Sequence, residues 1–270
     1  QGLVWTDFDS TAQLVETLAH NPGITWVQVP FSGVETYMPY IDETRTWTSA
    51  KGVFGGAVAE LALGLLLGGM RHIAGYARKQ EWSEDHGRTL FGARVTILGA
   101  GGIAQSLISM LKPFNCHITV VRNREGDVPG ADVVLTTSRL HEALLRADAV
   151  LMAIALTPQT HGIMGKAEFE LMQSHAWLVN VGRGKQIATD DLVWALETGE
   201  IGGAALDVTD PEPLPTGHPL WAMPNCIITP HVGNTAEMVP PLLALRIAEN
   251  VRRFAAGEQL IGIIDPTVGY

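Results

Sequence analysis

A glycine-rich turn near the middle of this 270-residue chain constrains the fold more than any other feature. The apolar run Val95–Leu98 leads directly into the letters GAGGIA, and a helical pattern follows. A strand, G-x-G-x-x-A and a helix in this order are typical of a βαβ unit that binds a dinucleotide. Gly99 permits the tight turn, Gly101 lets the backbone approach a pyrophosphate, and Ala104 lets the helix pack on the strand. The predicted cofactor contacts are Gly99, Ala100, Gly101, Gly102 and Ile103.

Short apolar runs alternate with helical patterns along most of the chain. This alternation predicts βαβ units and an α/β fold with a parallel sheet. Five prolines make Asp210–Pro224 an irregular loop. The expected strands are 24–29, 94–98, 117–121, 149–154, 177–180, 204–207 and 226–229. The expected helices are 57–78, 103–114, 138–147, 166–172, 189–198 with Thr189 as N-cap, and 239–256 ending at Gly257.

Composition excludes several classes of protein. A hydrophobic fraction of 46% indicates a large packed core, and a net charge of −10 argues against nucleic acid as a partner. Cys116 and Cys226 lie outside any metal-binding spacing, so we expect no metal site and reduced thiols in a cytoplasmic protein. The apolar stretch Val53–Met70 contains Glu60 and five glycines. It therefore favours a buried or interface helix over a membrane span.

The end of the strand after the glycine turn indicates which cofactor binds. An NAD site usually has Asp or Glu there, which bonds the ribose 2′-hydroxyl. This chain has Arg122, Asn123 and Arg124 instead. A guanidinium binds a 2′-phosphate through charge-assisted bonds, so we predict that NADP(H) is preferred and that NAD(H) is possible. The alternative is a solvated basic turn whose arginines contact nothing.

Three polar residues follow short apolar strands in the second half of the chain. Arg183 lies in VNVGRG, Glu212 in ALDVTDPEP and His231 in ITPHVG. Ligands bind beyond the carboxyl ends of strands in open α/β sheets, so these side chains can converge beside a nicotinamide. Arg suits a substrate carboxylate, His can protonate a carbonyl oxygen, and a carboxylate can hold the imidazole. Taken singly, each residue has a structural alternative: a strand cap, a solvated acid or a hydrogen-bonded histidine.

The sequence resembles the D-isomer-specific 2-hydroxyacid dehydrogenases nearly from end to end. Beyond the glycine turn and the three segments above, the shared motifs are AVAE at Ala57–Glu60, LTPQT at Leu156–Thr160, HPLW at His218–Trp221 and the closing Gly269-Tyr270. Two departures are local: Ala104 stands for the third glycine, and Ala155 for a proline common before LTP.

The resemblance implies roles for particular residues. Arg183 would bind the substrate carboxylate and polarise the carbonyl, His231 would be the acid/base, and Glu212 its carboxylate partner. Asp207 and Thr157 would contact the cofactor. Backbone N–H groups of the loop at Ser32, Gly33 and Val34 would hold the substrate carboxylate.

The resemblance also implies a Rossmann-type doubly wound sheet at 55–235, inserted in a smaller flavodoxin-like substrate-binding domain formed by 1–54 and 236–270. A strand and a helix that the family has before the position of Leu3 are not in this sequence. The apolar helix at 57–78 would contribute to a homodimer.

The expected function is hydride transfer between NADP(H) and a small 2-oxo or 2-hydroxy acid of D configuration, such as glyoxylate or hydroxypyruvate. The Arg-Asn-Arg sequence is similar to that of NADP-preferring glyoxylate/hydroxypyruvate reductases in the family. Two alternatives are an NAD-dependent member acting on another acid such as phosphoglycerate, and a non-catalytic nucleotide-sensing protein that resembles the corepressors of this fold. The sequence predicts no membrane partner.

Overall fold

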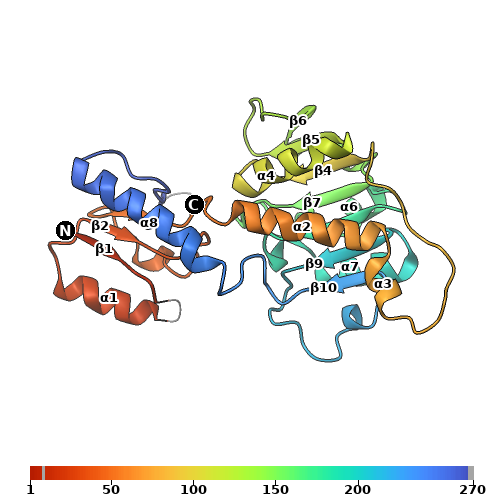
Figure 1. Ribbon diagram of the computed structural model, residues 1–270, viewed down its shortest axis with the longest axis horizontal. Coiled ribbons are helices and arrows are strands. Elements are labelled where there is room, and N and C mark those ends of the chain that lie inside the picture. Colours follow the sequence, from red (N-terminus) through yellow and green to blue (C-terminus); the bar gives the residue numbers. More distant parts are fainter. Residues whose placement is uncertain (8–9, 267–270) are drawn as a thin grey trace. The chain divides into compact units, whose positions relative to one another are not determined.

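The computed structural model describes residues 1–7 and 10–266 (Figure 1). The chain forms two compact units, a smaller one of Gln1–Phe54 with Asn234–Tyr270 and a larger one of Gly55–Gly233. The larger unit therefore ends at Gly233, two residues before the expected domain boundary at 235. The predicted Gly269-Tyr270 motif lies outside the described residues.

The larger unit is built on a seven-stranded parallel sheet in the order β10-β9-β8-β7-β4-β5-β6, which confirms the doubly wound α/β fold. Strand order reverses between β4 and β7, and ligands of such sheets bind at this switch point. Its strands are β4 (Arg94–Leu98), β5 (His117–Arg122), β6 (Val133–Thr136), β7 (Ala149–Met152), β8 (Trp177–Asn180), β9 (Gly203–Leu206) and β10 (Cys226–Ile228). Its helices are α2 (Gly55–Met70), α3 (Ile73–Ala77), α4 (Gly102–Leu111), α5 (Leu140–Leu144), α6 (Lys166–Leu171) and α7 (Thr189–Thr198), with 3-10 turns η2 (Lys112–Phe114), η3 (Thr137–Arg139), η4 (Gly184–Gln186) and η5 (Pro219–Trp221).

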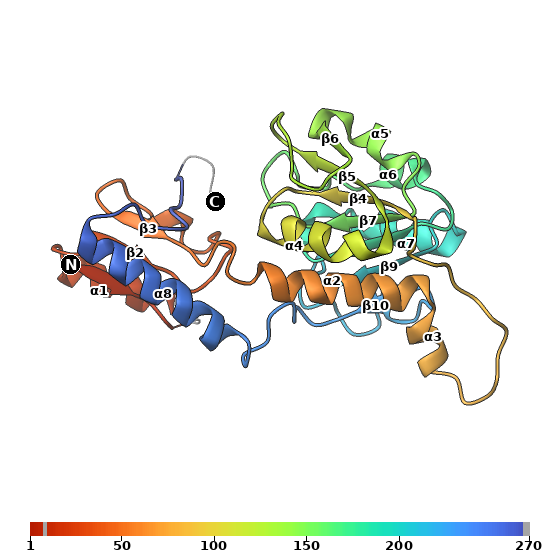
Figure 2. The same ribbon diagram turned by 45° about the horizontal axis from the view of Figure 1, so that its top comes forward.

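Helices cover both faces of this sheet (Figure 2). Helices α2 and α4 pack together on one face, and α2 crosses β8, β9 and β10. On the other face, side chains of α5, α6 and α7 join those of the central strands in one buried cluster. Strands β7, β8 and β9 are buried at every position, as a parallel sheet covered on both sides requires.

Several predicted boundaries differ from the structure. The helix expected at 57–78 is interrupted, because His72 adopts a left-handed conformation (φ 57°) between α2 and α3. Thr189 is not the N-cap of α7: Ala188 takes that position, and the Thr189 hydroxyl donates to the Asp210 carbonyl at 2.7 Å. The helix expected at 103–114 tightens into η2 at its end, where Pro113 lies. Among the described residues, no helix is long and apolar enough to cross a membrane.

The other expected helix boundaries hold within a residue, except that the helix at 138–147 shortens to α5 after η3. The expected strands at 24–29 and 149–154 end earlier, at Gln28 and Met152. The residues that follow Gln28 and Met152 form loops instead. The loop after Met152 contains Thr157, a predicted cofactor contact. Four elements were not predicted from the sequence: β1, α1, β3 and β6, of which the three strands are only three or four residues long.

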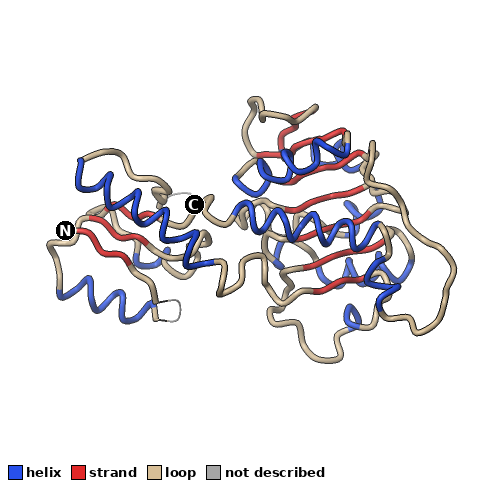
Figure 3. Tube along the Cα trace, in the orientation of Figure 1, coloured by secondary structure: helices blue, strands red, loops and turns tan. Residues whose placement is uncertain are grey.

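The smaller unit contains the parallel sheet β1-β2-β3. Figure 3 shows its strands with α1 and α8. Leu14 and Leu18 of α1 pack with Val27 and Trp47 on one face, and Phe254 of α8 contacts Trp26, with 5.1 Å between ring centroids. Its elements are β1 (Gly2–Val4), α1 (Thr11–His20), β2 (Trp26–Gln28), η1 (Met38–Tyr40), β3 (Thr46–Thr48) and α8 (Val239–Ala256).

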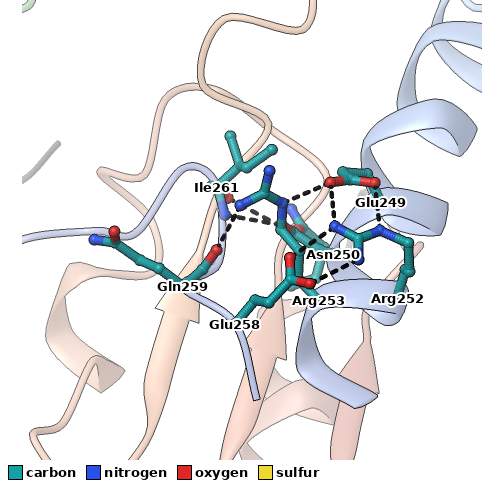
Figure 4. Close-up of polar contacts among 8 residues, drawn as sticks. Glu249, Asn250, Arg252, Arg253, Glu258, Gln259 and Ile261 are labelled. Atoms are coloured by element: carbon teal, nitrogen blue, oxygen red, sulfur yellow. Dashed lines mark hydrogen bonds and ion pairs between the residues drawn. The ribbon is translucent and has the colours of Figure 1, made fainter. Parts of the chain in front are cut away.

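A buried amide network attaches α8 and the following segment to this sheet, and Figure 4 shows its contact between Asn250 and Ile261. The Asn250 side chain is fully buried and donates to the Gln28 side-chain oxygen and the Ile261 carbonyl, both at 2.9 Å. Its own oxygen accepts the Ile261 N–H at 2.8 Å. Thr48 donates to the same Gln28 oxygen at 2.9 Å. Because each buried polar group has a partner, the network fixes the chain segment at 261 against β2.

Candidate active site

The glycine turn has the geometry of a phosphate cradle. Gly99 has φ 112°, and a Cβ there would lie 2.4 Å from the Ala153 carbonyl oxygen, so only glycine fits. A Cβ at Gly101 would meet nothing within 4 Å, which leaves the space beside the backbone open. Helix α4 begins at Gly102 with Gly101 as N-cap, and its first N–H groups have no intrahelical acceptor. These residues fit the pyrophosphate of a dinucleotide.

The basic turn after β5 places a partly buried guanidinium near the same sheet edge. Arg122 is the last residue of β5, and its Nε is buried with no hydrogen-bond partner among the described residues. Asn123 and Arg124 follow in an exposed turn. An unpaired buried donor is costly, and a bound anion would remove that cost through charge-assisted bonds.

The loop after β7 is closed by one hydroxyl. Thr160 is buried, and its Oγ1 accepts the Thr157 N–H and donates to the Ala155 carbonyl, both at 2.7 Å. Ala155, which stands where a proline is expected, therefore lies in a loop that the Thr160 side chain holds. Thr157, a predicted cofactor contact, has its backbone fixed by this arrangement.

Glu212 and His231 are brought together, as the sequence predicts. Nδ1 of His231 lies 2.6 Å from Oε1 of Glu212, and both side chains are about half exposed. Glu212 comes from the loop after β9 and His231 from the segment after β10. With Nδ1 occupied by the carboxylate, Nε2 is the nitrogen left to exchange a proton with a ligand.

Asp207 holds the turn that carries the histidine. Its side chain is buried, and its Oδ1 accepts from the Thr229 hydroxyl at 2.6 Å and the Val232 N–H at 2.9 Å. Its Oδ2 accepts the Gly233 N–H at 2.9 Å. His231 itself has φ 55°, a left-handed conformation that this set of hydrogen bonds sustains. The predicted contact of Asp207 with a cofactor stays a prediction.

Arg183 follows β8 in an extended conformation, and two buried amides hold its backbone. Its N–H donates to Gln186 Oε1 at 2.9 Å, and its carbonyl accepts from Asn180 Nδ2 at 3.0 Å. The guanidinium Nη1 donates to the Gly182 carbonyl at 2.9 Å. Because β8, β9 and β10 are adjacent and parallel, Arg183, Asp207 and His231 all follow carboxyl ends at one edge of the sheet.

The predicted substrate-binding residues Ser32 and Gly33 belong to the smaller unit. The Ser32 hydroxyl donates to the Ala50 carbonyl at 2.9 Å. Within the described part of the chain, the backbone N–H groups of Ser32 and Gly33 have no acceptor. The supporting side chains of Asn180, Gln186 and Thr229 were not predicted from the sequence, because a single amide or hydroxyl residue forms no motif by itself.

This edge of the larger unit combines a phosphate cradle, a cation and a carboxylate–imidazole pair. A cation can bind an acid group, and an imidazole held by a carboxylate can give a proton to a neighbouring oxygen. In the described residues, no group of three or more potential metal ligands occurs. The arrangement is suited to the reduction of a carbonyl beside a carboxylate.

Comparison with known proteins agrees with this geometry. Residues 63–233 match the family "D-isomer specific 2-hydroxyacid dehydrogenase, NAD binding domain". The chain is 39% identical over 271 residues to a Corynebacterium melassecola protein named for its position in the proB 3′ region, covering 97% of this chain and 88% of that protein. It is 34% identical over 213 residues to human glyoxylate reductase/hydroxypyruvate reductase, covering 75% of this chain and 64% of the human protein.

A solved structure has a similar fold. The D-isomer-specific 2-hydroxyacid dehydrogenase of Xanthobacter autotrophicus Py2, crystallised with NADPH and MES, is 30% identical and superposes with a TM-score of 0.83. The superposition covers 94% of this chain and 81% of that structure.

Proposed function

The chain belongs to the D-isomer-specific 2-hydroxyacid dehydrogenase family, and on that premise we propose that it reduces a small 2-oxo acid, such as glyoxylate or hydroxypyruvate, with NADPH. The observation that carries the proposal is the 2.6 Å contact of Glu212 and His231 at the sheet edge where Arg183 also lies. A proton donor and a carboxylate-binding cation are the two protein groups that this reaction needs.

Each of these residues has a defined part in the proposed reaction. Arg183 binds the substrate carboxylate and draws charge toward the carbonyl oxygen. His231 gives its Nε2 proton to that oxygen as the carbonyl carbon becomes a CH–OH group. Glu212 holds the Nδ1–H and stabilises the imidazolium form before the transfer. When bound, the nicotinamide supplies the hydride in reduction and takes it up in the reverse direction.

The glycine turn and the basic turn would hold the cofactor. Gly99, Gly101 and the first N–H groups of α4 suit the pyrophosphate, and Arg122 and Arg124 suit a 2′-phosphate. The partnerless Nε of Arg122 supports NADP(H) over NAD(H). The homologous Xanthobacter enzyme was crystallised with NADPH, which agrees with this preference. In the larger unit, Thr157 and Asp207 are the further cofactor contacts that we propose. Ser32 and Gly33 of the smaller unit are proposed substrate contacts.

The test is the oxidation of NADPH, followed by absorbance, with glyoxylate, hydroxypyruvate, 3-phosphohydroxypyruvate and a bulky 2-oxo acid, each repeated with NADH. We expect turnover with the small acids and a higher kcat/KM for NADPH. Preference for NADH or for the phosphorylated acid would favour the NAD-dependent alternative. No turnover with any of the four would favour a nucleotide-sensing protein.

We also propose that the chain forms a homodimer through the outer side of α2 and the segment after it. Gly56 and Gly64 of α2 face open space, and large apolar side chains lie exposed beyond the helix at Ile73 and Trp82. Packing of a second copy against these residues would remove the exposed apolar side chains from water. Light scattering of the purified protein tests it: a monomer at micromolar concentration would contradict the proposal.

A further inference from the structure

Gln186 is a fully buried side chain that joins two loops of the candidate site. It ends η4, just after β8, and its Oε1 accepts the Arg183 N–H at 2.9 Å. Its Nε2 donates to the carbonyl oxygen of Ile154 at 2.8 Å. Ile154 belongs to the loop after β7, which continues to Thr157. One amide therefore links the proposed substrate-binding arginine to the loop of a proposed cofactor contact.

The surroundings of Gln186 require an amide. At its buried end one partner is a donor, the Arg183 N–H, and the other is an acceptor, the Ile154 carbonyl. A carboxylate offers only acceptors and an apolar side chain offers neither, so each would take away the partner of at least one of these two partly buried backbone groups. Gly182 makes room for the amide, because a Cβ there would lie 2.5 Å from Gln186 Oε1.

A second amide completes the support of the arginine. The fully buried Asn180 donates from Nδ2 to the Arg183 carbonyl at 3.0 Å, and its Oδ1 accepts the Gly182 N–H at 2.9 Å. Both backbone polar groups of Arg183 are thus held from inside the fold. The guanidinium lies at the end of a long side chain, so a small rotation of this backbone would move it by a large distance.

We propose that Gln186 is a positioning residue, which fixes Arg183 against the loop after β7 so that the guanidinium meets the substrate carboxylate beside the cofactor. The inference rests on the proposed function, since it gives Arg183 the substrate. Misplacement of a binding group by about 1 Å can cost on the order of a hundredfold in rate. We expect replacement of Gln186 to lower kcat/KM for the 2-oxo acid about tenfold or more, with a smaller effect on the Kd of NADPH.

The first experiment compares Gln186→Glu with Gln186→Met over a pH range. Ionised, the new glutamate cannot donate to the Ile154 carbonyl; protonated, it can, and its shape is that of the original amide. Relative to wild type, kcat/KM of Gln186→Glu should therefore recover several-fold between about pH 8 and about pH 5, where a carboxyl with raised pKa protonates. Gln186→Met, which has no titrating group, should stay impaired by a constant factor. Equal and pH-independent losses in the two variants would overturn the inference.

The second experiment asks whether Gln186 acts through Arg183. In a double-mutant cycle, Gln186→Met should change kcat/KM by less than about twofold once Arg183→Ala has removed the guanidinium, because the two changes act on one interaction. A general loss of structure would impair both backgrounds alike, and full additivity would therefore refute a positioning role. Thermal unfolding of each variant measures any loss of stability separately.

A third measurement does not depend on turnover. Amide hydrogen exchange should show the Arg183 N–H protected in wild type and exchanging at least about tenfold faster in Gln186→Met. Inactivity of the wild type toward every 2-oxo acid would overturn the proposed function. In that case the hydrogen-exchange data by themselves would show whether Gln186 holds the Arg183 backbone. Unchanged protection of the Arg183 amide would overturn the inference whatever the activity.

Discussion

The backbone N–H of His231 donates to the carbonyl oxygen of Asp207 at 2.9 Å, while the Asp207 carboxylate binds the two N–H groups that follow His231. The proposed acid is therefore held in its left-handed conformation by a residue that does not touch its ring in the structure. Orientation by Glu212 and placement by Asp207 are separate contributions, and they can be measured separately.

Removal of the imidazole should abolish the proton transfer. We expect His231→Ala to lower kcat on the order of a hundredfold or more, with the Kd of NADPH within about twofold of wild type. Glu212→Gln keeps an oxygen near Nδ1 but loses the negative charge, so it should give a smaller loss in kcat. Steady-state kinetics and a fluorescence titration with NADPH measure the two quantities. A His231→Ala variant with wild-type turnover would show that another group donates the proton.

Asp207→Asn should destabilise the turn, because the amide nitrogen cannot accept the hydrogen bonds that the carboxylate accepts. One buried N–H left unpaired costs about 1–3 kcal/mol, which thermal unfolding should show as a lower Tm. Thr229→Val is the matched control: it removes one hydroxyl donor to the same carboxylate and should cost less than Asp207→Asn. Equal stability of Asp207→Asn and wild type would mean that the turn does not depend on this carboxylate.

Arg122→Ser should affect the two cofactors differently. Loss of a charge-assisted pair with a 2′-phosphate, worth about 1.5–3 kcal/mol, predicts a rise of roughly 10- to 100-fold in KM for NADPH. The KM for NADH should change little, since NADH lacks the phosphate. Arg139→Ser serves as a control, because that arginine pairs with Glu142 at the surface. A rise in KM that is the same for both cofactors would argue for a general structural effect.

The Glu249 carboxylate predicts an acid-sensitive contribution to stability. Hydrogen bonds from Arg252 and then Arg253 lower its pKa from 4.5 to about 2 (Figure 4). A carboxyl whose folded pKa is depressed stabilises the fold above its unfolded pKa, and this stabilisation is lost as pH falls through the folded value. Because the Glu249 side chain is partly exposed to solvent, the effect should be small and should weaken with added salt.

The measurement is Tm against pH at low and high salt. Relative to wild type, Glu249→Gln should be less stable near neutral pH and should approach the wild-type Tm as pH falls toward about 2. Glu16→Gln in α1 is a control, because Glu16 is exposed and its carboxylate has no arginine partner among the described residues. A constant difference in Tm across the pH range would contradict the predicted linkage.

Sequence by itself determined the features that depend on local pattern. The glycine turn could be predicted because Gly99 and Gly101 stand between an apolar strand and a helix, and each glycine has a steric reason. The contact of Glu212 with His231 could be predicted because both residues follow strands whose parallel order brings their carboxyl ends to one edge. Motif order, and the family that it resembles, gave these residues their proposed roles.

Tertiary structure alone decided which buried groups support those residues. Gln186 and Asn180 act through hydrogen bonds to backbone groups, and Thr229 acts through a hydrogen bond to the Asp207 carboxylate. A polar residue in a loop after a strand does not reveal such a partner in the sequence. The same reason explains the errors at His72 and Thr189. A helix end and a cap depend on which neighbouring groups are available, and these neighbours are set by packing of the whole sheet.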